Sequence, residues 1–290
     1  MQGTSQGTEV AKSTGVNLQR IILWIGVVLI VIFCLAPVLW QVLTSFKVNN
    51  AISAVPNIYI PSPNQLTFEH YQSLGTGFWR YLFNSAFVSF TSTLVCLILG
   101  APAAYTLARL RLPGEQIILA CILIISLFPY VLLFLGLLEI VKAVGLGNNY
   151  LALIIPYTAI NLPFTILILR SFFQQLPKDL EDSAQVDGYN TIQMLLQIVL
   201  PMALPALVTT GILTFIFAWN EFIFALTFIT REEMKTIPVA VAQLGGNSAF
   251  EIPYGPIAAA TVAGTLPLVL LVLIFQRRIV QGITAGAVKG

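Results

Sequence analysis

Acidic side chains that could take part in chemistry are few in this chain, and three of them lie together within residues 180–205. Glu181, Asp182 and Asp187 occur there in a mostly polar segment between two long apolar runs. Ionised carboxylates are costly inside hydrocarbon, so this segment must face water or another protein. Two interpretations follow: a docking surface for a partner, or a long loop whose acidic face is solvated.

The sequence contains no recognisable catalytic or metal-binding motif. Its single histidine, His70, excludes an HExxH zinc site and a histidine-based triad. The three cysteines have no CxxC spacing, and no G-x-x-x-x-G-K phosphate-binding loop occurs. We therefore predict no catalytic residue, no metal and no cofactor bound by this chain. His70 itself is expected to be an exposed loop residue.

Composition identifies the class of protein. Hydrophobic residues make up 57% of the 290 residues and charged residues only 9%, which is far from the range of soluble domains. The chain is therefore predicted to be an all-α integral membrane protein, with room for roughly five to seven spans of about 20 residues. A net charge of +2 gives no reason to expect nucleic acid as a partner.

Apolar runs predict six transmembrane helices in one bundle, the domain 18–276. The runs cover about residues 18–43, 84–108, 115–141, 151–173, 204–229 and 256–275. Pro156 and Pro163 interrupt the fourth run, but proline is tolerated in membrane helices. Residues 1–17 have almost no apolar content and are expected to be a disordered tail, and residues 277–290 to form a second tail.

Lysine and arginine positions indicate the orientation. With the amino terminus in the cytoplasm, nine of the 14 basic residues fall inside and five outside, as the positive-inside rule requires. The inside set is Lys12, Arg20, Arg109, Arg111, Arg170, Lys178, Arg277, Arg278 and Lys289. Both tails and the polar segment are therefore predicted to be cytoplasmic.

The polar segment is predicted to contain two short helices. Pro177 suits a first helical turn, and Gly188 suits a carboxyl-terminal cap, so the first helix covers about residues 178–187. Asn190 or Thr191 can cap the second helix. Its apolar face is predicted from the helical spacing of Ile192, Leu195, Leu196 and Val199.

Two parts of this segment resemble the EAA signature of permeases from ATP-binding-cassette importers, E-A-A-x-x-x-G followed by I-x-L-P. They are the residues DSAQVDG at 182–188 and IVLP at 198–201. Three further stretches, at 217–222, 257–260 and 282–290, resemble the smaller permease of maltose importers and its trehalose-importer relatives. Asp182 and Ser183 depart from the pattern, which has Glu and Ala at these positions.

This resemblance implies a type I importer permease fold with a cytoplasmic coupling helix in segment 178–200, which contacts a separate ATPase. The implied contact residues are Glu181, Asp182, Ser183, Ala184, Asp187 and Gly188. Whether Asp182 or Glu181 makes the contact of the family's glutamate stays open.

The resemblance also implies partners. These are a second homologous permease, a dimer of cytoplasmic ATPase subunits that holds ATP and Mg, and an extracytoplasmic sugar-binding protein, assembled in the bacterial cytoplasmic (inner) membrane. The implied substrate is a disaccharide or small α-glucoside similar to maltose, trehalose or glucosylglycerol. A loop containing Gly245, Gly246, Asn247 and Ser248 is a candidate contact for the binding protein, or an ordinary turn.

Trp219, Asn220 and Glu221 place a polar group inside the fifth apolar run. One interpretation puts them on the translocation path, where the indole stacks on a sugar and the polar groups bind hydroxyls. The other is a polar contact between helices. An ion-coupled secondary transporter or channel is the alternative function, but Glu221 alone gives it little support. A membrane-embedded enzyme would need a catalytic constellation that we do not find.

Overall fold

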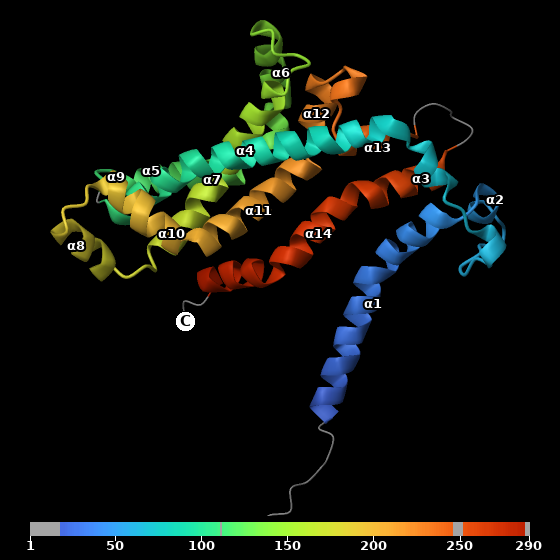
Figure 1. The fold of residues 1–290 in the computed structure, drawn as a ribbon, viewed down its shortest axis with the longest axis horizontal. Helices are drawn as coiled ribbons and strands as arrows, with labels where there is room; N and C mark the ends of the chain where they lie inside the picture. Colours follow the sequence, from blue (N-terminus) through green and yellow to red (C-terminus); the bar gives the residue numbers. More distant parts are fainter. Residues whose placement is uncertain (1–17, 111, 246–251, 288–290) are drawn as a thin grey trace, which may run out of the picture.

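The computed structural model describes residues 18–110, 112–245 and 252–287. Within these ranges the regular structure is helical, apart from one isolated bridge between Lys47 and Leu66. Several helices extend along the longest axis of the molecule, while α1 (Leu18–Phe46) diverges from the rest of the bundle (Figure 1).

Four helices are long and apolar enough to cross a membrane, and six spans result if each of two bent helix pairs counts as one. The four are α1, α4 (Gly75–Arg109), α7 (Leu151–Phe173) and α14 (Tyr254–Ala287). Pro156 and Pro163 lie inside α7 without ending it, as predicted. The fourth span has its predicted bounds, whereas α4 begins earlier than predicted and α14 continues past residue 275 to Ala287.

The third and fifth spans are not the continuous helices that the apolar runs predicted. In the third, α5 (Glu115–Leu127) meets the following helices, η2 (Tyr130–Leu133) and α6 (Phe134–Ala143), at 86°. Phe128 is extended there, because Pro129 disfavours a helical conformation in the residue before it. In the fifth, α11 (Leu204–Asn220) stops at an extended Glu221, and α12 (Ile223–Phe228) follows.

The remaining elements are short. Between α1 and α4 lie three of them: α2 (Asn49–Ile52), η1 (Pro63–Gln65) and α3 (Glu69–Ser73). The polar segment holds α8 (Asp179–Val186), α9 (Thr191–Met194), the π-helical turn η3 (Leu195–Val199) and α10 (Leu200–Met202). After α12 come η4 (Glu232–Met234) and α13 (Ile237–Gln243).

His70 is buried, so the expectation of an exposed loop residue was wrong. Only 5% of the residue is accessible, and its Nε2 lies 2.8 Å from the carbonyl oxygen of Lys47. Gly255 at the start of α14 packs against the imidazole so closely that a Cβ there would lie 2.2 Å from Nε2. The loop is covered by a helix that is remote in sequence, which no local pattern reveals.

The core of the bundle is the packing of α4 against α7. Gly100 of α4 allows this approach, since a Cβ at this position would lie 2.8 Å from Cγ2 of the fully buried Thr165. One turn earlier, Cys96 Sγ lies 3.2 Å from Thr165 Oγ1. Small residues let membrane helices pack closely, and van der Waals contact then supplies much of the association energy.

The replacement Gly100→Ala should therefore destabilise the bundle. We expect overpacking to lower the free energy of unfolding by about 1–3 kcal/mol, measured as a lower melting temperature of the purified protein in detergent. Gly136→Ala in α6 is the control, because a Cβ there meets nothing within 4 Å. Equal melting temperatures for the two variants would contradict the close-packing interpretation.

Candidate functional site

The helix α8 is defined at its carboxyl end by the glycine that the sequence indicated. Gly188 has a φ of +85°, and its N–H donates to the carbonyl of Gln185 at 3.1 Å. The N–H of Tyr189 donates to the carbonyl of Ala184 at 3.0 Å, which completes a Schellman motif. At the other end, α8 begins at Asp179, so Pro177 precedes the first turn instead of lying in it.

Asn190 caps the second helix of the segment, as predicted. Its Oδ1 accepts from the N–H of Gln193 at 2.9 Å, and the Gln193 side chain accepts from the N–H of Asn190 at 3.0 Å. The predicted apolar face is only half buried: Leu195 and Val199 are covered, whereas Ile192 and Leu196 are 69% and 57% exposed. The helical period identifies the apolar stripe, but not how much of it the chain itself covers.

Glu181 points into the protein. Its Oε1 forms an ion pair with Arg109 Nε at 2.6 Å, and its Oε2 accepts from the Tyr105 hydroxyl at 3.0 Å. The charged side chains are 6% exposed for Arg109 and 11% for Glu181. Tyr105 and Arg109 belong to the last turns of α4, so this contact fastens α8 to the end of α4.

Contacts from two arginines to backbone carbonyls strengthen this attachment of α8 to the bundle. Arg109 Nη2 donates to the carbonyl of Leu176 at 2.6 Å, in the turn between α7 and α8. Arg170 of α7 donates through Nε to the carbonyl of Leu107 at 3.0 Å and pairs through Nη2 with Glu115 Oε1 at 2.7 Å. The ends of α4, α5 and α7 and the start of α8 are thus linked at one end of the bundle.

The other predicted contact residues of α8 divide into two groups. Asp182, Ser183, Asp187 and Gly188 are exposed, while Ala184 is buried against the bundle. Exposed apolar side chains accompany the carboxylates: Val186 is 87% exposed, and Ile192 and Leu196 lie on the next helix. The exposed surface of the polar segment therefore combines carboxylates with uncovered apolar area, a combination typical of docking surfaces.

Tyr105 and Arg109 were not predicted as part of this site. The basic turn after the second apolar run placed Arg109 at a membrane boundary, which is a sequence signal for headgroups or a partner. Its pairing with a carboxylate on a helix far along the chain depends on how α4 and α7 pack, and sequence spacing does not show this.

The second predicted site surrounds the break after α11. Glu221 is 4% exposed; its Oε2 accepts from the Tyr157 hydroxyl at 2.6 Å and its Oε1 from the N–H of Phe224 at 3.0 Å. Glu221 therefore makes a polar contact between helices, one of the two interpretations of the sequence, here with α7, and it also caps α12. Trp219 is 4% exposed, whereas Asn220 is exposed.

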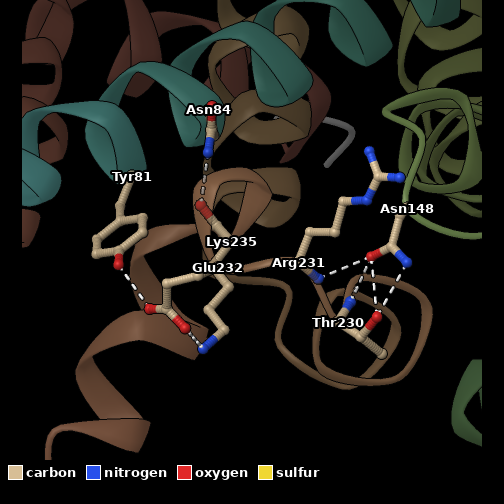
Figure 2. Close-up of polar contacts among 7 residues, drawn as sticks. All are labelled: Tyr81, Asn84, Asn148, Thr230, Arg231, Glu232 and Lys235. Carbon is tan, nitrogen blue, oxygen red and sulfur yellow. Dashed lines mark hydrogen bonds and ion pairs between the residues drawn. The ribbon is translucent and has the colours of Figure 1, made fainter.

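At the end of the bundle opposite α8, side chains from two elements form hydrogen bonds with the loop 230–235 (Figure 2). From α4, Asn84 donates to backbone carbonyls of this loop, and the Tyr81 hydroxyl donates to Glu232 Oε1 at 2.6 Å. From the turn between α6 and α7, Asn148 Oδ1 accepts from the N–H groups of Thr230 at 2.7 Å and Arg231 at 2.8 Å.

Ionisation of Glu232 supports this arrangement. Hydrogen bonds from Lys235 and, next, from Tyr81 hold the pKa of Glu232 below its usual value. The carboxylate form and its contacts therefore persist as the pH falls, until the pH passes through this lowered pKa.

The predicted binding-protein contacts follow α13 in the sequence. Gly245 is half-buried after α13, where a Cβ would lie 3.5 Å from Ile257 Cδ1. Gly246, Asn247 and Ser248 lie outside the described residues. In the described part of the chain, no three His, Cys, Asp or Glu side chains come together as metal ligands would.

A bundle of membrane-spanning helices with a short, capped and acid-bearing helix at one end is compatible with a transport permease, and comparison with known families shows this class. The chain belongs to the family described as binding-protein-dependent transport system inner membrane component, whose model matches residues 96–285.

Curated relatives match over nearly their whole length. The chain is 40% identical to the trehalose transport system permease protein SugB of Mycobacterium tuberculosis, over 90% of this chain and 95% of the relative. It is also 40% identical to the trehalose/maltose transport system permease protein MalG of Thermococcus litoralis (94% and 98%). Identity is 39% to the sulfoquinovosyl glycerol transport system permease protein SmoH of Agrobacterium fabrum (88% and 89%).

Solved structures share the fold. A chain of a bacterial ABC transporter involved in the import of the acidic polysaccharide alginate superposes with a TM-score of 0.75 at 23% sequence identity. The match covers 90% of this chain and 97% of the other. The alginate transporter in complex with its pentasaccharide-bound periplasmic protein gives a TM-score of 0.63 at 18% identity, over 89% of this chain and 92% of that chain.

The buried ion pair between Arg109 and Glu181 predicts that either single variant is less stable than the double variant. Glu181→Leu or Arg109→Leu alone leaves one buried charge without its partner, which costs about 3–5 kcal/mol, so each should lower the melting temperature clearly. The double variant removes both charges and should melt closer to wild type than either single variant. Thermal unfolding of the purified protein in detergent measures this, and additive losses in the double variant would contradict it.

Proposed function

We propose that this chain is one membrane-spanning permease subunit of an ATP-driven sugar importer and forms half of its translocation pathway. The observation that carries this proposal is the surface of α8: Glu181 is held inside, while the carboxylates of Asp182 and Asp187 point outward beside exposed apolar residues. Such a rigid, uncovered surface suits docking to a separate ATPase. The permease family and the sugar-permease names of the relatives support the same conclusion.

The partners in this proposal follow from the family. They are a second homologous permease, an ATPase dimer that holds ATP and Mg, and an extracytoplasmic sugar-binding protein, for which Gly245, Gly246, Asn247 and Ser248 are the candidate contacts. The complex would reside in the bacterial inner membrane with both termini and α8 in the cytoplasm, as the distribution of basic residues requires.

Asp182 is proposed as the main acidic contact with the ATPase, because Glu181 is already paired within the chain. Asp187, Ser183 and Gly188 complete the contact. Three acidic residues lie in the first turn of α8, where the helix dipole favours negative charge, and the exposed two, Asp179 and Asp182, give this surface a negative potential.

The proposed mechanism is alternating access. ATP binding closes the ATPase dimer and displaces α8, which moves with the ends of α4 and α7 because they are fastened together. The differential binding of ATP to the closed state drives the change, and no bond of the sugar is made or broken.

A disaccharide or small α-glucoside is the proposed substrate. Two relatives are named for trehalose or maltose and a third for sulfoquinovosyl glycerol, all small glycosides. On the path, Asn220 is the exposed member of the predicted group, whereas Trp219 and Glu221 would contribute by holding the break after α11 in place.

ATP dependence tests the proposal against an ion-coupled transporter. Uptake of trehalose or maltose into proteoliposomes should require the ATPase, ATP and the binding protein. Uptake driven by a proton or sodium gradient without ATP would overturn the proposal.

Variants at Gly188 should distinguish the effect of its backbone conformation from the effect of its proposed contact with the ATPase. A Cβ at this position meets nothing within 4 Å in this chain, but the positive φ strains most side chains. We expect Gly188→Leu to abolish ATP-driven uptake while the protein still reaches the membrane. Asn adopts positive φ at low cost, so Gly188→Asn tests the effect of a side chain on the ATPase contact without backbone strain.

Co-purification of the ATPase measures the same contact directly. Asp182→Asn should reduce ATPase retention about five- to tenfold, as loss of a charge-assisted hydrogen bond predicts. The control Glu139→Gln alters an exposed carboxylate that pairs with Lys142 and should retain the ATPase fully. Full retention by Asp182→Asn would contradict the assignment.

A further inference from the structure

Polar side chains at both ends of α4 fix it to the two segments that face the proposed partners. At one end Tyr105 and Arg109 hold Glu181 of α8, the helix that would contact the ATPase. At the other end α4 holds the loop 230–237, which is the loop 230–235 together with the start of α13, on the side where the binding protein would approach. Figure 1 shows α4 extending between these two ends.

The contacts at the loop end are buried and directional. Asn84 Nδ2 donates to the carbonyls of Glu233 and Lys235, both at 2.9 Å. Figure 2 shows the bond to Lys235. Ser85 Oγ accepts from the N–H of Ile237 at 2.8 Å. Asn84 and Ser85 are each 1% exposed, so these bonds are shielded from water.

Between its two ends α4 is one continuous helix of 35 residues, about 50 Å long at a rise of 1.5 Å per residue. Pro102 lies inside this helix without ending it. Its neighbour α7 packs along it through Gly100 and Thr165, and Thr158 Oγ1 donates to the carbonyl of Ser92 at 3.3 Å. Bending α4 would break this packing.

The covalent route from α8 to the same loop is much less regular. It passes through the π-helical turn Leu195–Val199 and a 78° bend into α11, and then through the break at Glu221. π-helical turns and helix breaks are places where helices deform. A displacement of α8 would be absorbed along this route.

We propose that α4 transmits the position of α8 to the loop 230–237, and that Asn84 and Ser85 are positioning residues for this transmission. The proposal rests on the proposed function, since it connects the ATPase contact to the binding-protein side. Arrival of the loaded binding protein is then signalled to the ATPase through α4, although α11 is the span that follows α8 in sequence.

ATP hydrolysis by the reconstituted complex tests this, with and without maltose- or trehalose-loaded binding protein. We expect Asn84→Ala to reduce the maximal stimulation by the binding protein at least about fivefold. Basal hydrolysis and the half-saturating concentration of binding protein should stay unchanged, because neither the ATPase contact nor the docking surface is altered. Ser85→Ala, a smaller change, should show the same split and serves if Asn84→Ala folds poorly.

Asn148→Gly is the matched control. It removes the bonds from Asn148 to Thr230 and Arg231 in the same loop, and glycine accepts the φ of +57° at this position. Because Asn148 does not belong to α4, stimulation should be retained. If both variants lose stimulation equally, the shape of the loop is responsible and the role of α4 is overturned.

A double variant supplies the coupling measurement. If Asn84 and Glu181 act on one route, the combination of Asn84→Ala with Glu181→Gln should keep nearly the stimulation that remains in the more impaired of the two single variants. If the fold-losses of stimulation in the two single variants multiply in the double variant, the proposal is overturned. A wild-type complex that the binding protein does not stimulate would refute the proposed function itself. A stimulated wild type with an equally stimulated Asn84→Ala would refute only the role of α4.

Discussion

The ion pair between Arg109 and Glu181 is the interaction on which the functional end of this molecule depends. A polar helix beside a membrane has little apolar area with which to hold its place, and α8 buries only Glu181 and Ala184. A buried carboxylate is tolerated only when it is paired and hydrogen-bonded, and Arg109 and Tyr105 meet that requirement. The same pair therefore fixes α8 and determines which carboxylates remain for a partner.

A similar constraint shapes the rest of the bundle. In a membrane a buried polar group without an internal partner is costly. At the break after α11, the Glu221 carboxylate accepts from the N–H groups of Phe224 and Ala225, which would otherwise lack partners in the first turn of α12. Tyr157 completes the set from α7. The carboxylate that stands out in the apolar sequence thus caps the helix that follows the break.

The parts of the fold that depend on neighbouring residues could be predicted from the sequence. Apolar runs located the spans, and Gly188 and Asn190 located the helix ends in the polar segment, because caps are formed by adjacent residues. Contacts between distant elements could not be predicted: the burial of His70 and the pairing of Glu181 depend on which helices pack together. The break at Glu221 was missed because hydrophobicity alone does not distinguish a continuous helix from an interrupted one.

The way in which α8 is held has a consequence for the evolution of such importers. Its carboxyl end is closed by backbone hydrogen bonds at Gly188, and its inner face is held by Glu181. The side chains of Asp182, Ser183, Val186 and Asp187 project outward and contribute little to folding. In the proposed docking, they can therefore change together with the surface of an ATPase without loss of the fold, which would let one ATPase serve several permeases, or a permease acquire a new one.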